Sequence, residues 1–88
     1  MTFDKSKIIV QFFIGECMVD IGSLIKQEMQ RQGRGVTWLA KQIGRDRTLI
    51  YRIFNNKSID TDNLLRISVA LNHNFFDFYV EEYRKLAR

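Results

Sequence analysis

The 88-residue sequence contains no proline, only five glycines and a single cysteine, Cys17. The absence of proline and the scarcity of glycine favour helices joined by short turns over a sheet, which needs many turns. The lone cysteine excludes a disulfide within the chain. It is typical of proteins kept in a reducing compartment, so we expect a cytoplasmic protein.

The sequence also lacks a long hydrophobic run. A membrane-spanning helix needs roughly 20 predominantly apolar residues, whereas the apolar stretch at residues 8–14, IIVQFFI, is short and contains Gln11. Lys5 and Lys7 precede this stretch, as basic residues do in a signal peptide, but no small-residue cleavage site follows it. We therefore expect no membrane partner and no cleaved signal peptide.

What the sequence does contain is enough apolar material for one modest core. Hydrophobic residues make up 45% of the chain, an ordinary fraction for a globular domain. We assign residues 20–83 to the folded domain, residues 1–19 to an N-terminal extension and residues 84–88 to a C-terminal tail. The apolar part of the extension fits a strand, a helix start or a dimer arm, and a further hypothesis is that Met18 is the natural start.

Basic residues are concentrated in one part of the chain. From Asp20 to Lys57 there are eight basic and three acidic residues, whereas the remainder has six basic and seven acidic ones. A basic block beside a near-neutral remainder suits a surface that binds a polyanion such as DNA. A solvated basic surface without a ligand would give the same composition, so charge alone does not decide between the two.

Apolar spacing and capping residues predict five helices and no strand. The helices are expected at about residues 20–32, 36–43, 47–55, 61–71 and 75–87. Residues that tolerate a left-handed backbone follow three of them: Gly33, Gly44 and Asn72. Residues that favour an N-cap precede three: Asp46, Asp60 and Asn74. The short loops require neighbouring helices to pack together.

The segment WLAKQIGRDRTLIYRIF, residues 38–54, has the spacing expected of two helices that cross closely. Ala40 is small enough for the contact point, and Gly44 suits the turn between the helices. On the second of these helices, Ile50, Ile53 and Phe54 share one face. The opposite arc is polar and consists of Thr48, Tyr51, Arg52 and Asn55, with Arg47 at its edge. A helix of this width fits the major groove of B-DNA.

These residues resemble the helix-turn-helix of the Cro/repressor-type family of DNA-binding proteins, also called the XRE family. The similarity lies in LAKQIG followed by I..IF, and it continues in IGSLIK (residues 21–26) and LLRISVALNHNFFDF (residues 64–78). It covers about residues 20–80. It implies an all-α fold, namely a five-helix lambda-repressor-like bundle that contains a helix-turn-helix.

The resemblance also implies roles for individual residues. The residues implied to read bases are Arg47, Thr48, Tyr51 and Arg52. The residues implied to bind phosphates are Thr37, Lys41, Arg45, Asn55, Asn56 and Lys57. Many family members carry a charged pair at the positions of Met29 and Phe54; both are apolar here, so we expect these two side chains to pack together.

The expected function is that of a sequence-specific regulator of transcription, acting on double-stranded DNA as a repressor. We expect a homodimer, formed through the fifth helix or the N-terminal segment, because the aromatic residues at 75–83 point in too many directions to be buried on one helix. The alternative is a protein-interaction module, or an antitoxin-like partner, on the same fold. No nucleophile–base or metal-ligand pattern occurs, so we expect neither an enzyme nor a cofactor.

Overall fold

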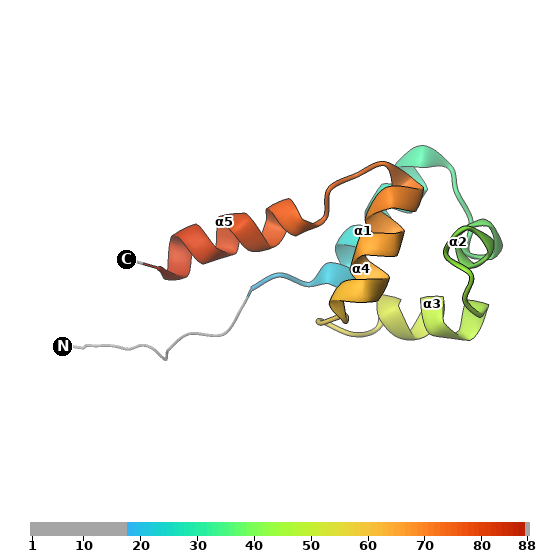
Figure 1. The fold of residues 1–88 in the computed structure, drawn as a ribbon, viewed down its shortest axis with the longest axis horizontal. Helices are drawn as coiled ribbons and strands as arrows, with labels where there is room; N and C mark the ends of the chain where they lie inside the picture. Colours follow the sequence, from blue (N-terminus) through green and yellow to red (C-terminus); the bar gives the residue numbers. More distant parts are fainter. Residues whose placement is uncertain (1–17, 88) are drawn as a thin grey trace.

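The computed structural model describes residues 18–87 and arranges them as five helices (Figure 1). These are α1 (Ile21–Gln32), α2 (Val36–Ile43), α3 (Arg47–Phe54), α4 (Thr61–Leu71) and α5 (Phe76–Leu86). No strand occurs within the described range. The predicted all-α, five-helix fold is therefore confirmed. Most of the expected N-terminal extension, residues 1–17, lies outside the described residues.

The predicted helix ends have the backbone conformation that their residues favour. Gly33, Gly44 and Asn72 all have positive φ angles, of 71°, 67° and 51°. At the other end of α4, the Asp60 side chain accepts a hydrogen bond of 2.8 Å from the backbone N–H of Asn63, as an N-cap should. Asp46 occupies the predicted N-cap position of α3, but its side chain makes no capping hydrogen bond.

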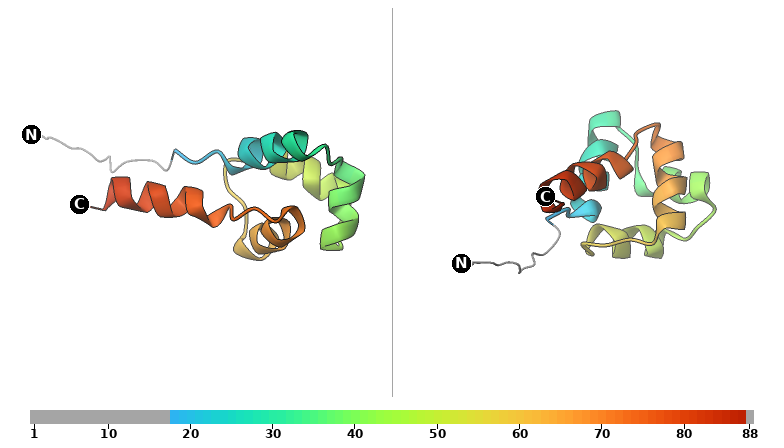
Figure 2. Two further views of the ribbon diagram at one scale, coloured as in Figure 1. Left: turned by 90° about the horizontal axis from the view of Figure 1, so that it is seen from above. Right: turned by 60° about the vertical axis from the view of Figure 1, so that its left-hand side comes forward.

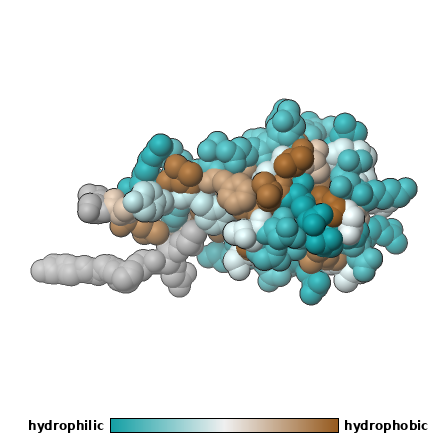
Figure 3. Space-filling model, viewed as in Figure 1, coloured by the Kyte–Doolittle hydropathy of each residue, from teal (hydrophilic) through white to brown (hydrophobic). Residues whose placement is uncertain are grey.

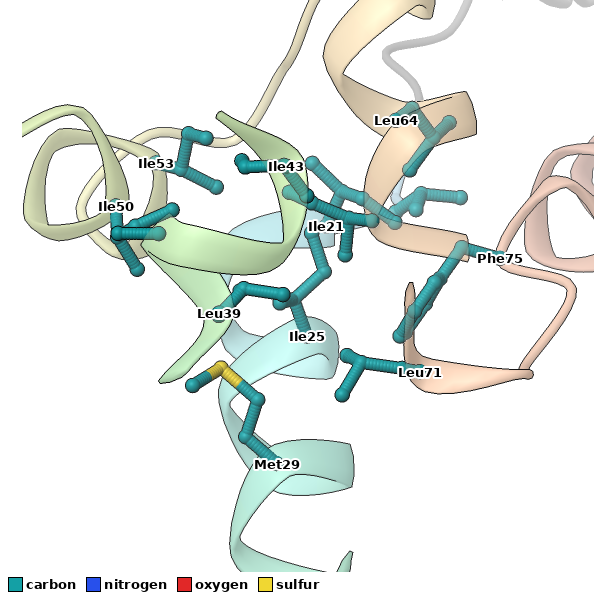
Figure 4. Close-up of a cluster of buried hydrophobic side chains, with 13 residues drawn as sticks. Ile21, Ile25, Met29, Leu39, Ile43, Ile50, Ile53, Leu64, Leu71 and Phe75 are labelled. Atoms are coloured by element: carbon teal, nitrogen blue, oxygen red, sulfur yellow. The ribbon is translucent and has the colours of Figure 1, made fainter. Parts of the chain in front are cut away.

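The core is formed by side chains from all of the first four helices and from the turn before α5. The largest fully buried side chains are Ile21, Ile25, Leu39, Ile50, Ile67, Leu71 and Phe75. Figure 4 shows several of these side chains pointing toward one another from α1, α2, α3 and α4. The helices that pack most closely are α2 with α3, α2 with α4, and α1 with α3. None of these pairs involves α5.

Helix α5 extends away from the other four helices (Figures 1 and 2). It is attached at its start by Phe75, whose side chain is fully buried. Near its other end, a buried Glu82 carboxylate accepts a hydrogen bond of 2.8 Å from the backbone N–H of Met18. Between residues 18 and 87, no helix combines the length and the apolar character needed to cross a membrane.

The start of α1 lies directly against the end of α3 at Gly22. A Cβ atom at this position would lie 2.2 Å from the carbonyl oxygen of Ile53 and 2.8 Å from those of Phe54 and Asn56. Beside it, the Ile21 N–H donates a hydrogen bond of 3.4 Å to the Lys57 carbonyl oxygen. The positive end of one helix dipole thus meets the negative end of the other, which is favourable. The contact fixes where α3 ends.

A second polar connection joins the C-terminal parts of α1 and α4. Glu28 is buried, and both of its carboxylate oxygens accept hydrogen bonds from the Arg31 guanidinium. Gln32 donates to the same carboxylate and to the Leu71 carbonyl oxygen, each at 2.7 Å. The hydrogen bonds from Arg31, followed by that from Gln32, lower the pKa of Glu28 to about 2.

Replacing Gly22 with alanine is expected to destabilise the protein by about 1–3 kcal/mol, because the new methyl group meets three backbone oxygens that cannot rotate away. Gly35→Ala is the matched control, since a Cβ at that position meets nothing within 4 Å. Urea unfolding followed by circular dichroism measures both. A Gly22→Ala variant as stable as the parent would contradict the described approach of α1 to α3.

The depressed pKa of Glu28 predicts a specific loss of stability in acid. Its contribution is fully present above the ordinary value of 4.5 and is lost as the pH falls through about 2. The free energy of unfolding should therefore fall less steeply over this range in Glu28→Gln than in the parent. Glu81→Gln, which alters an exposed carboxylate paired with Arg84, should retain the parent's acid dependence. Equal slopes in all three proteins would refute the assignment.

Candidate nucleic-acid interface

Helix α3 has one buried face and one exposed face. Ile50 and Ile53 are buried, and Leu49 and Phe54 are half-buried against the same core. The four residues implied to read bases are all exposed: Arg47, Thr48, Tyr51 and Arg52. The side chains that the sequence predicted to share one helix face therefore do lie together on the outside of α3. The apolar underside holds this polar face in a fixed orientation relative to α1 and α2.

The turn between α2 and α3 sets that orientation. Gly44 adopts the left-handed conformation, and the N–H of the next residue, Arg45, donates a hydrogen bond of 3.0 Å to the Ala40 carbonyl oxygen. The Ala40 side chain is buried, and its helix, α2, is in contact with both α3 and α4. The predicted use of a small residue at the contact point and a glycine in the turn is consistent with this geometry.

Two arginines on the exposed face are free to meet a ligand. Between residues 18 and 87, no carboxylate forms an ion pair with Arg47 or Arg52. An unpaired guanidinium keeps all its donors available for the bidentate pairing that guanine or a phosphate offers. Tyr51 is more constrained, because its ring packs edge-on against Phe54 with 6.4 Å between centroids.

The residues implied to bind phosphates precede or follow α3 along the chain, and all six are exposed. Thr37 and Lys41 lie one turn apart on α2, whereas Asn55, Asn56 and Lys57 follow α3. Within the described range, Lys41 and Lys57 have no acidic partner.

Asn55 and Asn56 also have a structural role that the sequence did not predict. The Asn55 side-chain amide donates 3.1 Å to the Tyr51 carbonyl oxygen, and the Asn56 amide donates 2.8 Å to that of Arg52. Both therefore satisfy carbonyl groups in the last turn of α3, which would otherwise lack partners. Each amide retains a second N–H for a phosphate.

Arg45 is turned toward α4 instead of being left unpaired. Its guanidinium donates to an Asp62 carboxylate oxygen at 3.3 Å and to its own neighbour's carbonyl, that of Gly44, at 3.2 Å. Asp62 is shared with Arg66, and all three side chains are exposed, so the pairing is weak. Arg45 remains at the edge of the interface, but it is less available than Lys41 or Lys57.

Two further cations border the helix-turn-helix and were not among the expected contacts. The Lys26 ammonium lies 5.8 Å from the centroid of the Phe54 ring, and the Arg34 guanidinium lies 4.4 Å from that of Trp38. These cation–π contacts hold positive charge beside α3 and α2. The basic block from Asp20 to Lys57 was the sequence signal for them, although charge counting could not show which ring each would cover. Trp38 itself is half-buried.

The contact expected between Met29 and Phe54 stays a prediction, supported by their common surroundings. Met29 is buried, Phe54 is half-buried against the same core, and both line one small hollow between α1 and the end of α3. The ring of His73 packs against that of the buried Phe75, with 4.8 Å between centroids. In the range 18–87, no group of three or more His, Cys, Asp or Glu residues is placed to hold a metal ion.

Comparison with known proteins gives no neighbour from which a role could be taken. No protein-family model matches this chain, and no curated protein or solved structure shows significant similarity to it. The resemblance to Cro/repressor-type proteins therefore remains an expectation carried by the residues themselves. A function can be inferred only from the residues themselves, above all from the exposed face of α3 and the charges around it.

Proposed function

We propose that this protein is a sequence-specific DNA-binding regulator of transcription that inserts α3 into the major groove. The observation that carries the proposal is the exposed face of α3, where Arg47 and Arg52 have no acidic partner among residues 18–87 and lie above an apolar underside. A helix-bound pair of arginines with a threonine beside them is the kind of donor set that reads guanine and thymine edges.

Electrostatics supports DNA as the ligand. The exposed face of α3 lies within the basic block from Asp20 to Lys57, where eight basic residues outnumber three acidic ones. Lys41 and Lys57 would bind phosphates on either side of the groove and fix the register of α3, while the base-reading residues supply selectivity. Because phosphate contacts release counterions, affinity should fall as salt rises. The logarithm of the binding constant should fall against the logarithm of the salt concentration with a slope of roughly −0.9 for each phosphate neutralised.

A single helix reads too few base pairs to be selective, so the proposed active form is a homodimer on a two-fold operator. Occupying such an operator would obstruct a promoter, and the proposed role is therefore repression. The proposed location of a protein with this function is the cytoplasm. Selection of bound sequences from a random duplex pool at about 150 mM salt tests it. The expected product is a two-fold motif with half-sites roughly 10 base pairs apart.

Two alanine variants separate the base-reading set from the phosphate-binding set. Arg52→Ala should weaken binding to the selected sequence by about 1–3 kcal/mol and relax the preference at one base pair of each half-site. Lys57→Ala should weaken binding to all sequences alike and reduce the salt slope by about one per protomer. Fluorescence anisotropy with matched and mismatched duplexes measures both effects.

Lys85→Ala is the control for these variants, because it removes the same charge from α5, outside the proposed interface. It should change affinity only slightly and leave base preference intact. If Arg52→Ala and Lys57→Ala bind every duplex as well as the parent, α3 is not the recognition helix. Enrichment of no sequence at all, with weak salt-sensitive binding only, would contradict the proposed function as a whole.

A further inference from the structure

A small hollow lies where α1, the start of α2 and the end of α3 meet. The side chains that line it are Lys26, Met29, Gln30, Arg34, Val36 and Phe54. We call it the α1–α3 hollow. Its volume is about 150 Å³, which is the size of a protein cavity that holds one benzene ring. None of its residues belongs to the set assigned to DNA.

The inner wall of the hollow is apolar. Met29 is buried, and Val36 and Phe54 are half-buried against the same core. The wall therefore offers a thioether, a branched aliphatic group and one aromatic ring to whatever enters. A flat apolar group would remove this wall from water and contact the Phe54 ring at the same time.

The outer edge of the hollow is polar and positively charged. Lys26 and Gln30 lie one turn apart on α1, and Arg34 follows just after the helix ends. The Lys26 ammonium lies 5.8 Å from the centroid of the Phe54 ring, and the Arg34 guanidinium lies 4.4 Å from that of Trp38. These ring contacts hold the two cations beside the hollow without neutralising their charge.

Neither cation has an anion to pair with. Among residues 18–87, no carboxylate forms an ion pair with Lys26 or Arg34. The only acidic residue of α1 is Glu28, which is buried and already bonded to Arg31. The α1–α3 hollow thus combines unpaired positive charge at its edge with an apolar wall inside.

The other apolar region of the surface differs in this respect. Figure 3 shows apolar side chains along α5 and over α4. The charges beside them are mutually paired, since Arg84 donates a hydrogen bond of 2.9 Å to Glu81, and Arg66 donates one of 3.2 Å to Asp62. That region has no excess charge to select a ligand, whereas the α1–α3 hollow selects an anion.

We propose that the α1–α3 hollow binds a small aromatic carboxylate, with the carboxylate group between Lys26 and Arg34. The ring of the ligand lies against Met29 and Phe54. The Arg34 guanidinium can donate two parallel hydrogen bonds to a carboxylate, and the Gln30 amide can donate another. A simple anion would leave the apolar wall exposed, and an uncharged ring would leave both cations unpaired. A single ring carrying a carboxylate satisfies both parts of the site.

This site goes beyond the proposed function, and it does not rest on it. A ligand in the hollow would contact α1, α2 and α3, the elements whose packing sets the direction of the exposed α3 face. If α3 binds DNA, the ligand and DNA would therefore change each other's affinity by the same factor. Binding of the ligand itself is measured without DNA.

Benzoate is the probe, because it is one ring with one carboxylate. The isotope-labelled full chain is titrated with benzoate at constant ionic strength, and amide chemical shifts are followed. Shifts that saturate are expected around residues 26–36 and at Phe54, with none along α5. Acetate and benzyl alcohol each supply half of the ligand's chemistry, so both should bind at least tenfold more weakly than benzoate.

Charge-removing variants test the assigned residues. Lys26→Gln and Arg34→Gln should each weaken benzoate binding at least fivefold. Lys85→Gln is the matched control, since it removes the same charge from α5, outside the hollow, and should leave the affinity unchanged. Circular dichroism of each variant confirms that the helices are retained.

Three outcomes would overturn the proposal: benzoate shifts that never saturate, acetate that binds as tightly as benzoate, or a Lys85→Gln protein that loses as much affinity as Lys26→Gln. The proposal is also wrong if benzoate fails to bind while Lys26→Gln and Arg34→Gln weaken binding to every duplex alike, because the two cations would then be phosphate contacts. Failure of the proposed function gives a different result. In that case benzoate binds as described, but no DNA sequence is enriched.

Discussion

The contact of Gly22 with the backbone that ends α3 is the constraint on which the proposed DNA interface depends. Three carbonyl oxygens, those of Ile53, Phe54 and Asn56, lie where any side chain on residue 22 would have to be. The position and end of α3 are therefore set by α1, while the Gly44 turn sets its relation to α2. Gly22 and Gly44 together therefore fix the direction in which the exposed arginines of α3 point.

The buried and the exposed residues of α3 have different roles. α3 is short, and an isolated helix of that length would not be stable in water. Its stability comes from Ile50 and Ile53, which are packed under it, and from Asn55 and Asn56, which bond to its last carbonyls. On the polar face, Arg47 and Arg52 have no acidic partner among residues 18–87, so their side chains are available to a ligand.

The sequence alone was sufficient to predict the features that depend on residues close together in the chain. Helix bounds followed from apolar spacing, and the left-handed turns at Gly44 and Asn72 followed from residues that tolerate that backbone. The role of Gly22 could not be foreseen, because a glycine within a helical pattern does not reveal which backbone lies beside it. The Glu28 cluster was missed for a similar reason: Gln32 connects it to Leu71, 39 residues away. The outward direction of α5 likewise depends on the buried Phe75.

The central claim is that DNA lies on the exposed face of α3, and amide chemical shifts test it most directly. Isotope-labelled full chain would be titrated with a mixed-sequence duplex at low salt, where electrostatic binding is strong. The account predicts that the largest shifts fall on Arg47, Thr48 and Arg52, with smaller ones near Thr37 and Lys57, and none along Val80 to Leu86. Shifts confined to α5, or the absence of any shift, would contradict it.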